Sequence, residues 1–161
     1  MYKHILVPID GSPLAEQVLP HVDTLARKFS SSVTLVRAIP SRDEIIALET
    51  PMSLAPRPEV FMDPTPIIQA EQEEAEAYLA ALEKRLNSQG ILAQYKHPEG
   101  PPAEVIVELA RQLEIDLIAM TTHGRSGLER VILGSVAEAV VRNAPCPVLL
   151  VRVHEATAQE S

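Results

Sequence analysis

The sequence predicts an α/β domain of three layers, in which five parallel strands form a doubly wound sheet with helices on both faces. Short apolar runs of strand length alternate along the chain with segments whose apolar residues recur at helical spacing. This alternation is typical of parallel sheets, because each crossover helix returns the chain to the same end of the sheet. Strands are expected at residues 4–10, 33–39, 91–97, 115–121 and 148–153, and helices at 13–29, 67–89, 103–113 and 135–143.

The first strand leads into a helix through a turn with clear start signals. Ser12 is a good N-cap residue and Pro13 suits the first helical position. Pro20 lies inside the helix that follows and is expected to kink it. The serines at 30–32 close this unit, and the apolar residues 33–39 are interpreted as a second buried strand.

Residues 40–66 differ from the rest of the chain because they contain six prolines. The segment is too long for an ordinary connection, so it is interpreted as a lid, a partner-contacting arm or a mobile loop. We expect a proline-rich surface loop with a short helical turn at residues 45–48.

The second half of the chain repeats the alternation. The helix at 67–89 is rich in Glu and Ala, and Gly90 is a stop signal. Its glutamates at positions 71, 73, 74 and 76 are interpreted as a solvated helix face. The strand at 91–97 alternates weakly and is placed at an edge, whereas 115–121 is apolar throughout and is placed centrally. We therefore expect one domain over residues 1–153 and a polar tail over 154–161.

Composition excludes several classes of partner. The 161-residue chain carries a formal net charge of −8, which argues against non-specific nucleic-acid binding and against an anionic membrane surface. It shows no signal-peptide pattern and no apolar run of ~20 residues, so a cytoplasmic location is predicted. The single cysteine, Cys146, can form neither an internal disulfide nor a zinc site by itself.

The loop after the fourth predicted strand holds Gly124, Gly127 and Gly134 within a chain that has only 6 glycines. Glycine serves either a strained backbone or the close approach of a ligand. Ser135 begins a helix, and the free N–H groups of a helix N-terminus accept phosphate. Its hydroxyl could cap that helix or bind a phosphate oxygen, and Arg125 could add charge-assisted hydrogen bonds.

The usual nucleotide signatures are absent from the sequence. There is no G-x-x-x-x-G-K-[ST] loop and no G-x-G-x-x-G after the first strand. Doubly wound sheets bind ligands beyond the carboxyl ends of their strands, where the strand order reverses. The turn after the first strand and the glycine loop after the fourth both lie at that edge, and they face each other across one crevice if the two strands are neighbours. Any phosphate site here must be of another kind.

These residues resemble the universal stress protein family. Its nucleotide-binding members carry G-x2-G-x9-G-[ST], and here Gly124, nine residues and Gly134-Ser135 match the second half, whereas Thr121 stands at the first glycine. Residues 5–12 and 144–151 are also similar to the family, so the resemblance covers nearly the whole chain in the right order.

The resemblance implies the family's Rossmann-like fold, also described as adenine nucleotide alpha hydrolase-like, with the first and fourth strands adjacent. It implies binding of ATP or AMP, with Mg²⁺ left open, and a homodimer through the last strand at 148–153. Carried over by position, the binding residues are Pro8, Ile9 and Asp10 for adenosine, Ala38 for adenine through its backbone, Met120 and Thr121 for ribose, His123, Gly124 and Arg125 beside the phosphates, and Gly134, Ser135 and Val136 holding them.

Two functions remain open on the sequence. One is a dimeric stress-response regulator that depends on an adenine nucleotide; the other is a nucleotide-free dimeric interaction protein with a vestigial crevice. Thr121 bears on the choice, because a β-branched residue resists positive φ but is harmless where the chain simply continues a strand. No catalytic residue is predicted: His123 is a lone histidine and Asp10 a lone carboxylate, so at most slow, incidental ATP hydrolysis is expected.

Overall fold

A computed structural model describes residues 1–49, 63–122 and 133–153 of the chain. Its five strands form one parallel sheet in the order β3-β2-β1-β4-β5, which confirms the predicted doubly wound class and the adjacency of the first and fourth strands. The strands are β1 (His4–Pro8), β2 (Ser32–Val36), β3 (Ala93–Lys96), β4 (Leu117–Thr121) and β5 (Val148–Val151).

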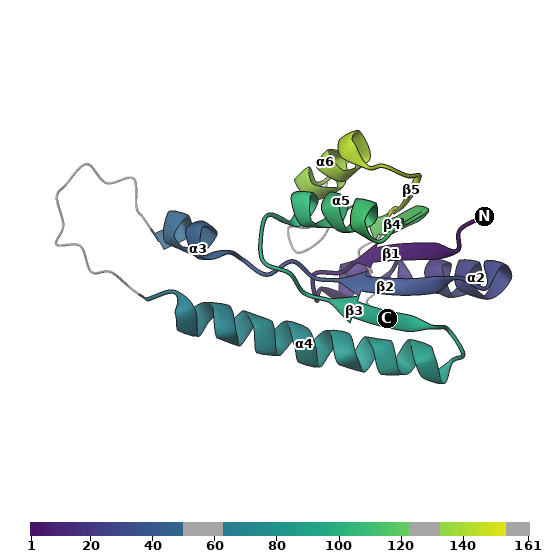
Figure 1. The fold of residues 1–161 in the computed structure, drawn as a ribbon, viewed down its shortest axis with the longest axis horizontal. Helices are drawn as coiled ribbons and strands as arrows, with labels where there is room; N and C mark the ends of the chain where they lie inside the picture. Colours follow the sequence, from purple (N-terminus) through teal and green to yellow (C-terminus); the bar gives the residue numbers. More distant parts are fainter. Residues whose placement is uncertain (50–62, 123–132, 154–161) are drawn as a thin grey trace, which may run out of the picture.

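Helices cover both faces of this sheet (Figure 1). They are α1 (Pro13–Glu16), α2 (Leu19–Phe29), α3 (Arg42–Glu49), α4 (Thr65–Ser88), α5 (Pro102–Gln112) and α6 (Ser135–Asn143). One hydrophobic core lies between the sheet and helices α2 and α4, and a second lies between the sheet and helices α5 and α6. None of the helices in the described ranges combines the length and hydropathy needed to cross a bilayer.

Strand β1 is the centre of the sheet because both of its faces are buried. Ile5 and Val7 point into the first core and Leu6 into the second, as the period of two along a strand requires. The register places Pro8 opposite Val36 of β2, and Leu6 opposite Ile118 of β4. The carboxyl ends of β1, β2 and β4 therefore meet at one edge of the sheet.

The helix predicted at 13–29 is two helices, α1 and α2, rather than one kinked helix. Pro20 is the second residue of α2, and its missing N–H cannot extend the hydrogen-bond ladder back into α1. The predicted start is correct, because the Ser12 hydroxyl accepts a hydrogen bond from the Ala15 N–H at 3.1 Å.

The proline-rich segment contains a helix where a short turn was expected. Helix α3 begins with a capping box: the Ser41 N–H donates to the Glu44 carboxylate at 2.8 Å, and the Glu44 N–H donates to the Ser41 hydroxyl at 3.4 Å. Helix α4 already begins at Thr65. Residues 50–62 and the predicted tail at 154–161 lie outside the described residues.

Helix α4 is anchored by its C-terminal two thirds. Its 24 residues span ~36 Å, much longer than any strand of the sheet. Ala75, Leu79, Leu82 and Leu86 form its buried face, whereas its first turns run past the carboxyl edge of the sheet beside α3 (Figure 1). The first turns of α4 are therefore held by other contacts than the rest of the helix.

A polar contact joins α4 to α1. The Tyr78 hydroxyl donates to one Glu16 carboxylate oxygen at 2.8 Å, and the Arg85 guanidinium lies 3.7 Å from the other. Burial of the phenol, with the hydrogen bond to Glu16, raises the pKa of Tyr78 well above its ordinary value. The neutral phenol is thus the form that the fold favours.

We expect Tyr78→Phe to lower the free energy of unfolding by about 1 kcal/mol at neutral pH, because it removes this hydrogen bond. The folded pKa is raised, so the contribution is fully present below the ordinary tyrosine pKa of about 10 and is lost as the pH rises through the folded value. Urea unfolding of both proteins from pH 7 to 11 measures this. A stability difference that stays constant above pH 10 would contradict the assignment.

Candidate functional site

The carboxyl ends of β1, β2 and β4 open into a crevice of about 370 Å³. It lies where the strand order reverses, since β2 and β4 flank β1 on opposite sides. The first turns of helices α5 and α6 form its upper wall, through Pro102, Ile106 and residues 134–137. The crevice is thus bounded by strand ends on one side and by helix N-termini on the other.

Most of the sequence-predicted site residues come together at this crevice. Nine of the twelve line it: Pro8, Ile9, Asp10, Ala38, Met120, Thr121, Gly134, Ser135 and Val136. The other three, His123, Gly124 and Arg125, lie outside the described residues. Residues that sequence reasoning missed also line it, namely Ala15, Val36, Arg37, Pro40, Glu71, Pro102, Ile106, Thr122 and Ala137.

The main chain of Ala38 faces the crevice. Just before it, Val36 accepts a hydrogen bond from Ile9 of the β1 side at 2.8 Å, whereas Arg37 and Ile39 donate to carbonyls on the β3 side. Successive residues of an extended chain alternate in direction, so the Ala38 N–H and C=O point toward the β1 side, where the crevice opens. Within the described residues no hydrogen bond occupies them, which leaves one donor and one acceptor for the edge of a planar ligand.

The turn after β1 fixes a carboxylate at the mouth of the crevice. Gly11 has φ +84°, a conformation that favours glycine. The Asp10 carboxylate accepts a hydrogen bond from the Ser12 N–H at 2.9 Å. One oxygen of Asp10 is thereby held toward α1, and its side chain lines the crevice.

The backbone conformation at Gly134 does not require a glycine. Gly134 is the N-cap of α6 with φ −60° and ψ 151°, a region open to every L-residue, and its N–H donates to the Thr122 carbonyl at 2.9 Å. Backbone strain is therefore excluded as the reason for glycine here, which leaves the preference of N-cap positions for glycine and the close approach of another group to the helix N-terminus. The first N–H groups of α6 together carry a partial positive charge.

Ser135 does not cap α6, so the first of the two roles that the sequence left open for its hydroxyl, helix capping, is excluded. It is the first helical residue, one position after the N-cap, and α6 has no side-chain cap. The Ser135 side chain is exposed and lines the crevice. Its hydroxyl is thus exposed at the crevice and is not used as a helix cap.

Thr121 continues the strand. It is the last residue of β4, pairs in register with Val151 and is 6% exposed. The position does not have the positive φ that a β-branched residue would resist. Thr121 thus fits the backbone without strain, and its side chain forms part of the crevice floor.

A buried ion pair borders the crevice beside Ala38. The Arg37 side chain is 4% exposed, and its guanidinium lies 3.2 Å from Glu71 and 3.1 Å from Glu74 of α4. The prediction that the acidic run is a solvated face holds for Glu73 and Glu76, but Glu71 and Glu74 bind this cation. The available signal was an arginine directly after an apolar strand, together with two glutamates at i and i+3 of one helix.

The described walls of the crevice carry few charged side chains. Its charged lining residues are Asp10, Arg37 and Glu71. Among residues 1–49, 63–122 and 133–153, no group of three or more His, Cys, Asp or Glu side chains could hold a metal. A larger hollow of about 790 Å³ lies over α5 and the 98–101 loop, but it contains none of the predicted site residues. We therefore place the site at the strand ends.

A parallel, doubly wound sheet whose reversal point opens below a helix N-terminus defines the class of α/β ligand-binding domains. A model of the universal stress protein family matches residues 1–152. The chain belongs to the universal stress protein family.

Known members are similar along almost their whole length. A universal stress protein of Methanocaldococcus jannaschii is 34% identical over 152 residues, which are 94% of this chain and 83% of the relative. A second protein of that archaeon, solved to assign its biochemical function, has a TM-score of 0.79 at 29% identity, over 97% of this chain and 99% of its own. The Archaeoglobus fulgidus universal stress protein in complex with dAMP has a TM-score of 0.64 at 20% identity, over 92% of this chain and 97% of its own.

We expect Ser135→Ala to change the free energy of unfolding by less than about 0.5 kcal/mol, because its hydroxyl caps nothing. Ser12→Ala is the matched control and should cost about 1 kcal/mol, because the Ser12 hydroxyl caps α1. Chemical unfolding of the two variants decides this. Equal losses would mean that Ser135 supports its helix after all.

Proposed function

We propose that this universal stress protein is a dimeric regulator whose crevice binds an adenine nucleotide, ATP or AMP. The observation that carries the proposal is Gly134, a glycine whose φ and ψ are open to any residue, at the N-terminus of a helix that faces the crevice. A phosphate accepted by that N-terminus explains the glycine, since a Cβ there would stand between phosphate and N–H groups.

The base end of the crevice suits adenine. The Ala38 N–H and C=O offer a donor beside an acceptor, which complements the ring nitrogen and the amino group on one edge of adenine. Apolar side chains of Ile9 and Met120 offer flat contacts for a purine. The Asp10 carboxylate is suited to accept hydrogen bonds from the ribose hydroxyls.

The phosphate end is assigned to α6. The main-chain N–H groups of Ser135 and Val136 and the Ser135 hydroxyl provide the donors, because the Gly134 N–H, which the sequence also assigned to the phosphates, already donates to the Thr122 carbonyl. We propose that His123, Gly124 and Arg125 complete the cradle. The dAMP complex of the Archaeoglobus fulgidus relative supports an adenine mononucleotide in this fold. Mg²⁺ would arrive with a triphosphate. The proposed function includes no catalysis beyond incidental hydrolysis of ATP. The cytoplasmic location stays a prediction.

The dimer is proposed to form through β5. This strand is at the edge of the sheet, and its four residues, Val148–Val151, are all apolar and only partly buried. An apolar edge strand invites pairing with another strand. A second copy of the same strand would cover it on the family's pattern.

The first measurement is calorimetric titration of nucleotide-free protein with ATP and Mg²⁺, AMP and GTP. We expect micromolar binding of the adenine nucleotides and at least tenfold weaker binding of GTP, because guanine presents the opposite hydrogen-bond pattern to Ala38. Binding of none of them by an intact dimer would favour the alternative function, a nucleotide-free interaction protein with a vestigial crevice. The feature that favours this alternative is Thr121, which stands at the position of the motif's first glycine.

We expect Gly134→Val to weaken ATP binding on the order of 100-fold, because its branched side chain covers the helix N-terminus and removes charge-assisted hydrogen bonds. Adenosine affinity should stay unchanged, and the protein should remain folded, since the φ and ψ at this position are open to valine. Titrations with ATP and adenosine test both statements. Unchanged ATP affinity would rule out the phosphate assignment.

We expect Leu150→Pro to give a folded monomer. The Pro147 and Val151 carbonyls accept hydrogen bonds from β4, so the Leu150 N–H points to the free edge and proline removes no ladder bond there. Leu149→Pro is the matched control, which should disrupt the β4–β5 ladder and the fold. Sedimentation and circular dichroism measure the outcome; a folded Leu150→Pro dimer would show that another surface pairs the subunits.

A further inference from the structure

The buried ion pair between Arg37 and helix α4 lies beside the proposed base end of the crevice. The Arg37 Nη1 lies 3.1 Å from Glu74 Oε1, and Nη2 lies 3.2 Å from Glu71 Oε2. The guanidinium is 4% exposed, whereas the two carboxylates are 31% and 64% exposed. A cation is thus covered by the helix, while its counter-charges stay in contact with water.

The part of α4 that lies over the sheet is docked without this arginine. The helix is already anchored by buried Ala75, Leu79, Leu82 and Leu86, and by the contact of Tyr78 with Glu16. The ion pair itself adds little net stability, because desolvation of the buried guanidinium offsets its attraction to the two carboxylates. Arg37 instead acts at the first turns of α4, where the helix leaves the sheet.

The chain that Arg37 secures is supported on one side only. Beyond β2, the Arg37 N–H donates to Lys96 at 3.2 Å, the Ile39 N–H to Pro98 at 2.9 Å, and the Gly100 N–H to Ile39 at 2.9 Å. All of these bonds run to the β3 side. On the other side β1 has ended, and the Ala38 peptide faces the crevice with no partner strand.

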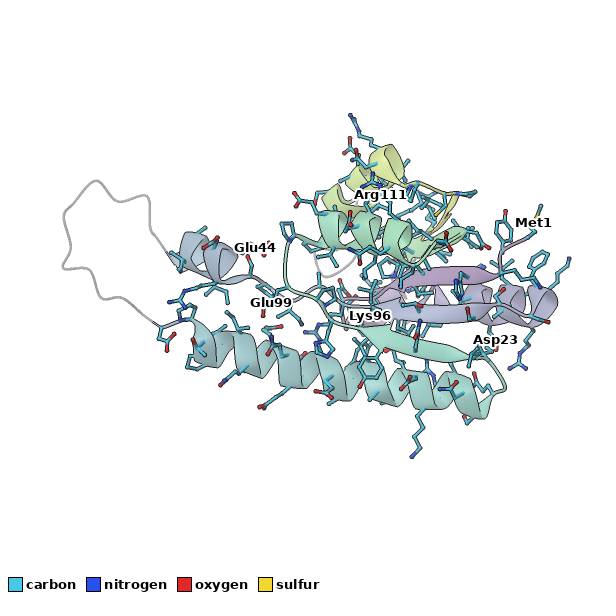
Figure 2. The ribbon with its side chains drawn as sticks, in the orientation of Figure 1. Met1, Asp23, Glu44, Lys96, Glu99 and Arg111 are labelled. Carbon is cyan, nitrogen blue, oxygen red and sulfur yellow. The ribbon has the colours of Figure 1, made fainter. Side chains whose placement is uncertain are left out.

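Helix α4 also holds the β3 side of this chain. The Gln72 amide donates to the Glu99 carboxylate at 2.9 Å, and Figure 2 shows Glu99 beside α4 on the stretch after β3. One helical turn, residues 71–74, therefore grips both chains that leave the sheet at this point. A rigid turn that spans the ends of β2 and β3 fixes how far the Ala38 peptide stands from the crevice floor.

We propose that Arg37 is a positioning residue for base selectivity: its clamp to Glu71 and Glu74 sets the Ala38 peptide against the purine edge. The inference rests on the proposed function and adds a residue to it that touches neither ribose nor phosphate. Hydrogen-bond recognition requires a fixed peptide, because a peptide free to shift accommodates either pattern of donors and acceptors.

The test is Arg37→Met, which keeps the aliphatic length and leaves two solvated glutamates. Adenosine and ATP should each bind about tenfold more weakly, by the same factor, because the loss is at the base end. The preference for ATP over GTP should fall by a similar factor, whereas the ratio of ATP to adenosine affinity should not change. Glu71→Gln combined with Glu74→Gln should give the same pattern, more weakly, because neutral acceptors remain.

The matched control is Arg85→Met, which removes another arginine that links α4 to the body of the protein. It should leave all three affinities unchanged. Thermal unfolding distinguishes a purely structural role of Arg37 from the proposed positioning role. A purely structural role would lower the melting temperature of the variant and leave its ratio of ATP to GTP affinity unchanged. If Arg37→Met does not fold, the double glutamine variant decides.

The outcomes separate the two proposals. Adenine-selective binding by the unaltered protein, with the same selectivity in the Arg37→Met and double glutamine variants, would overturn this inference alone. No adenosine or ATP binding by the unaltered protein would overturn the proposed function and the inference together. Loss of selectivity in Arg85→Met as well would assign the effect to α4 docking in general and overturn the role of Arg37.

Discussion

The pairing of β1 with a neighbour on each side is the constraint on which the rest of the structure depends. Ile5, Leu6 and Val7 are fully buried and contribute to both cores, so the strand cannot shift without exposing apolar surface. The chain then crosses over one face to reach β2 and returns on the other face to reach β4. The strand ends consequently diverge around the end of β1, and the crevice, the Ala38 peptide and the N-terminus of α6 occupy that gap.

Helix α4 is held by different kinds of interaction along the two parts of its length. Over the sheet, the helix is held by apolar contacts such as those of Leu79 and Leu82, which are worth most to stability and specify little geometry. Past the sheet, it is held by directed contacts, the ion pairs to Arg37 and the Gln72–Glu99 hydrogen bond. Such contacts are geometrically demanding, which suits a wall of the crevice better than a hydrophobic contact would.

Local signals in the sequence were enough for the fold and for most of the crevice. Strand runs, the start of α1 and the start of α6 at Ser135 depend on neighbouring residues only, so the strand ends that line the crevice could be predicted. The partners of Arg37 could not, because they lie 34 and 37 residues away and depend on how α4 registers over the sheet. The role of the Ser135 hydroxyl was equally open, since it depends on which of two adjacent residues, Gly134 or Ser135, is the last non-helical one.

The two edges of the sheet differ in chemistry. Strand β3 presents exposed Gln94 and Lys96 and is flanked by α4, whereas β5 is apolar along its whole length. A lysine on an edge strand discourages the approach of another strand. A sheet with one receptive edge can extend in a single direction, and a symmetric contact uses that edge on both copies at once. In the dimer proposed above, growth would stop at two copies, so the edge that would permit association would also prevent polymerisation into a filament.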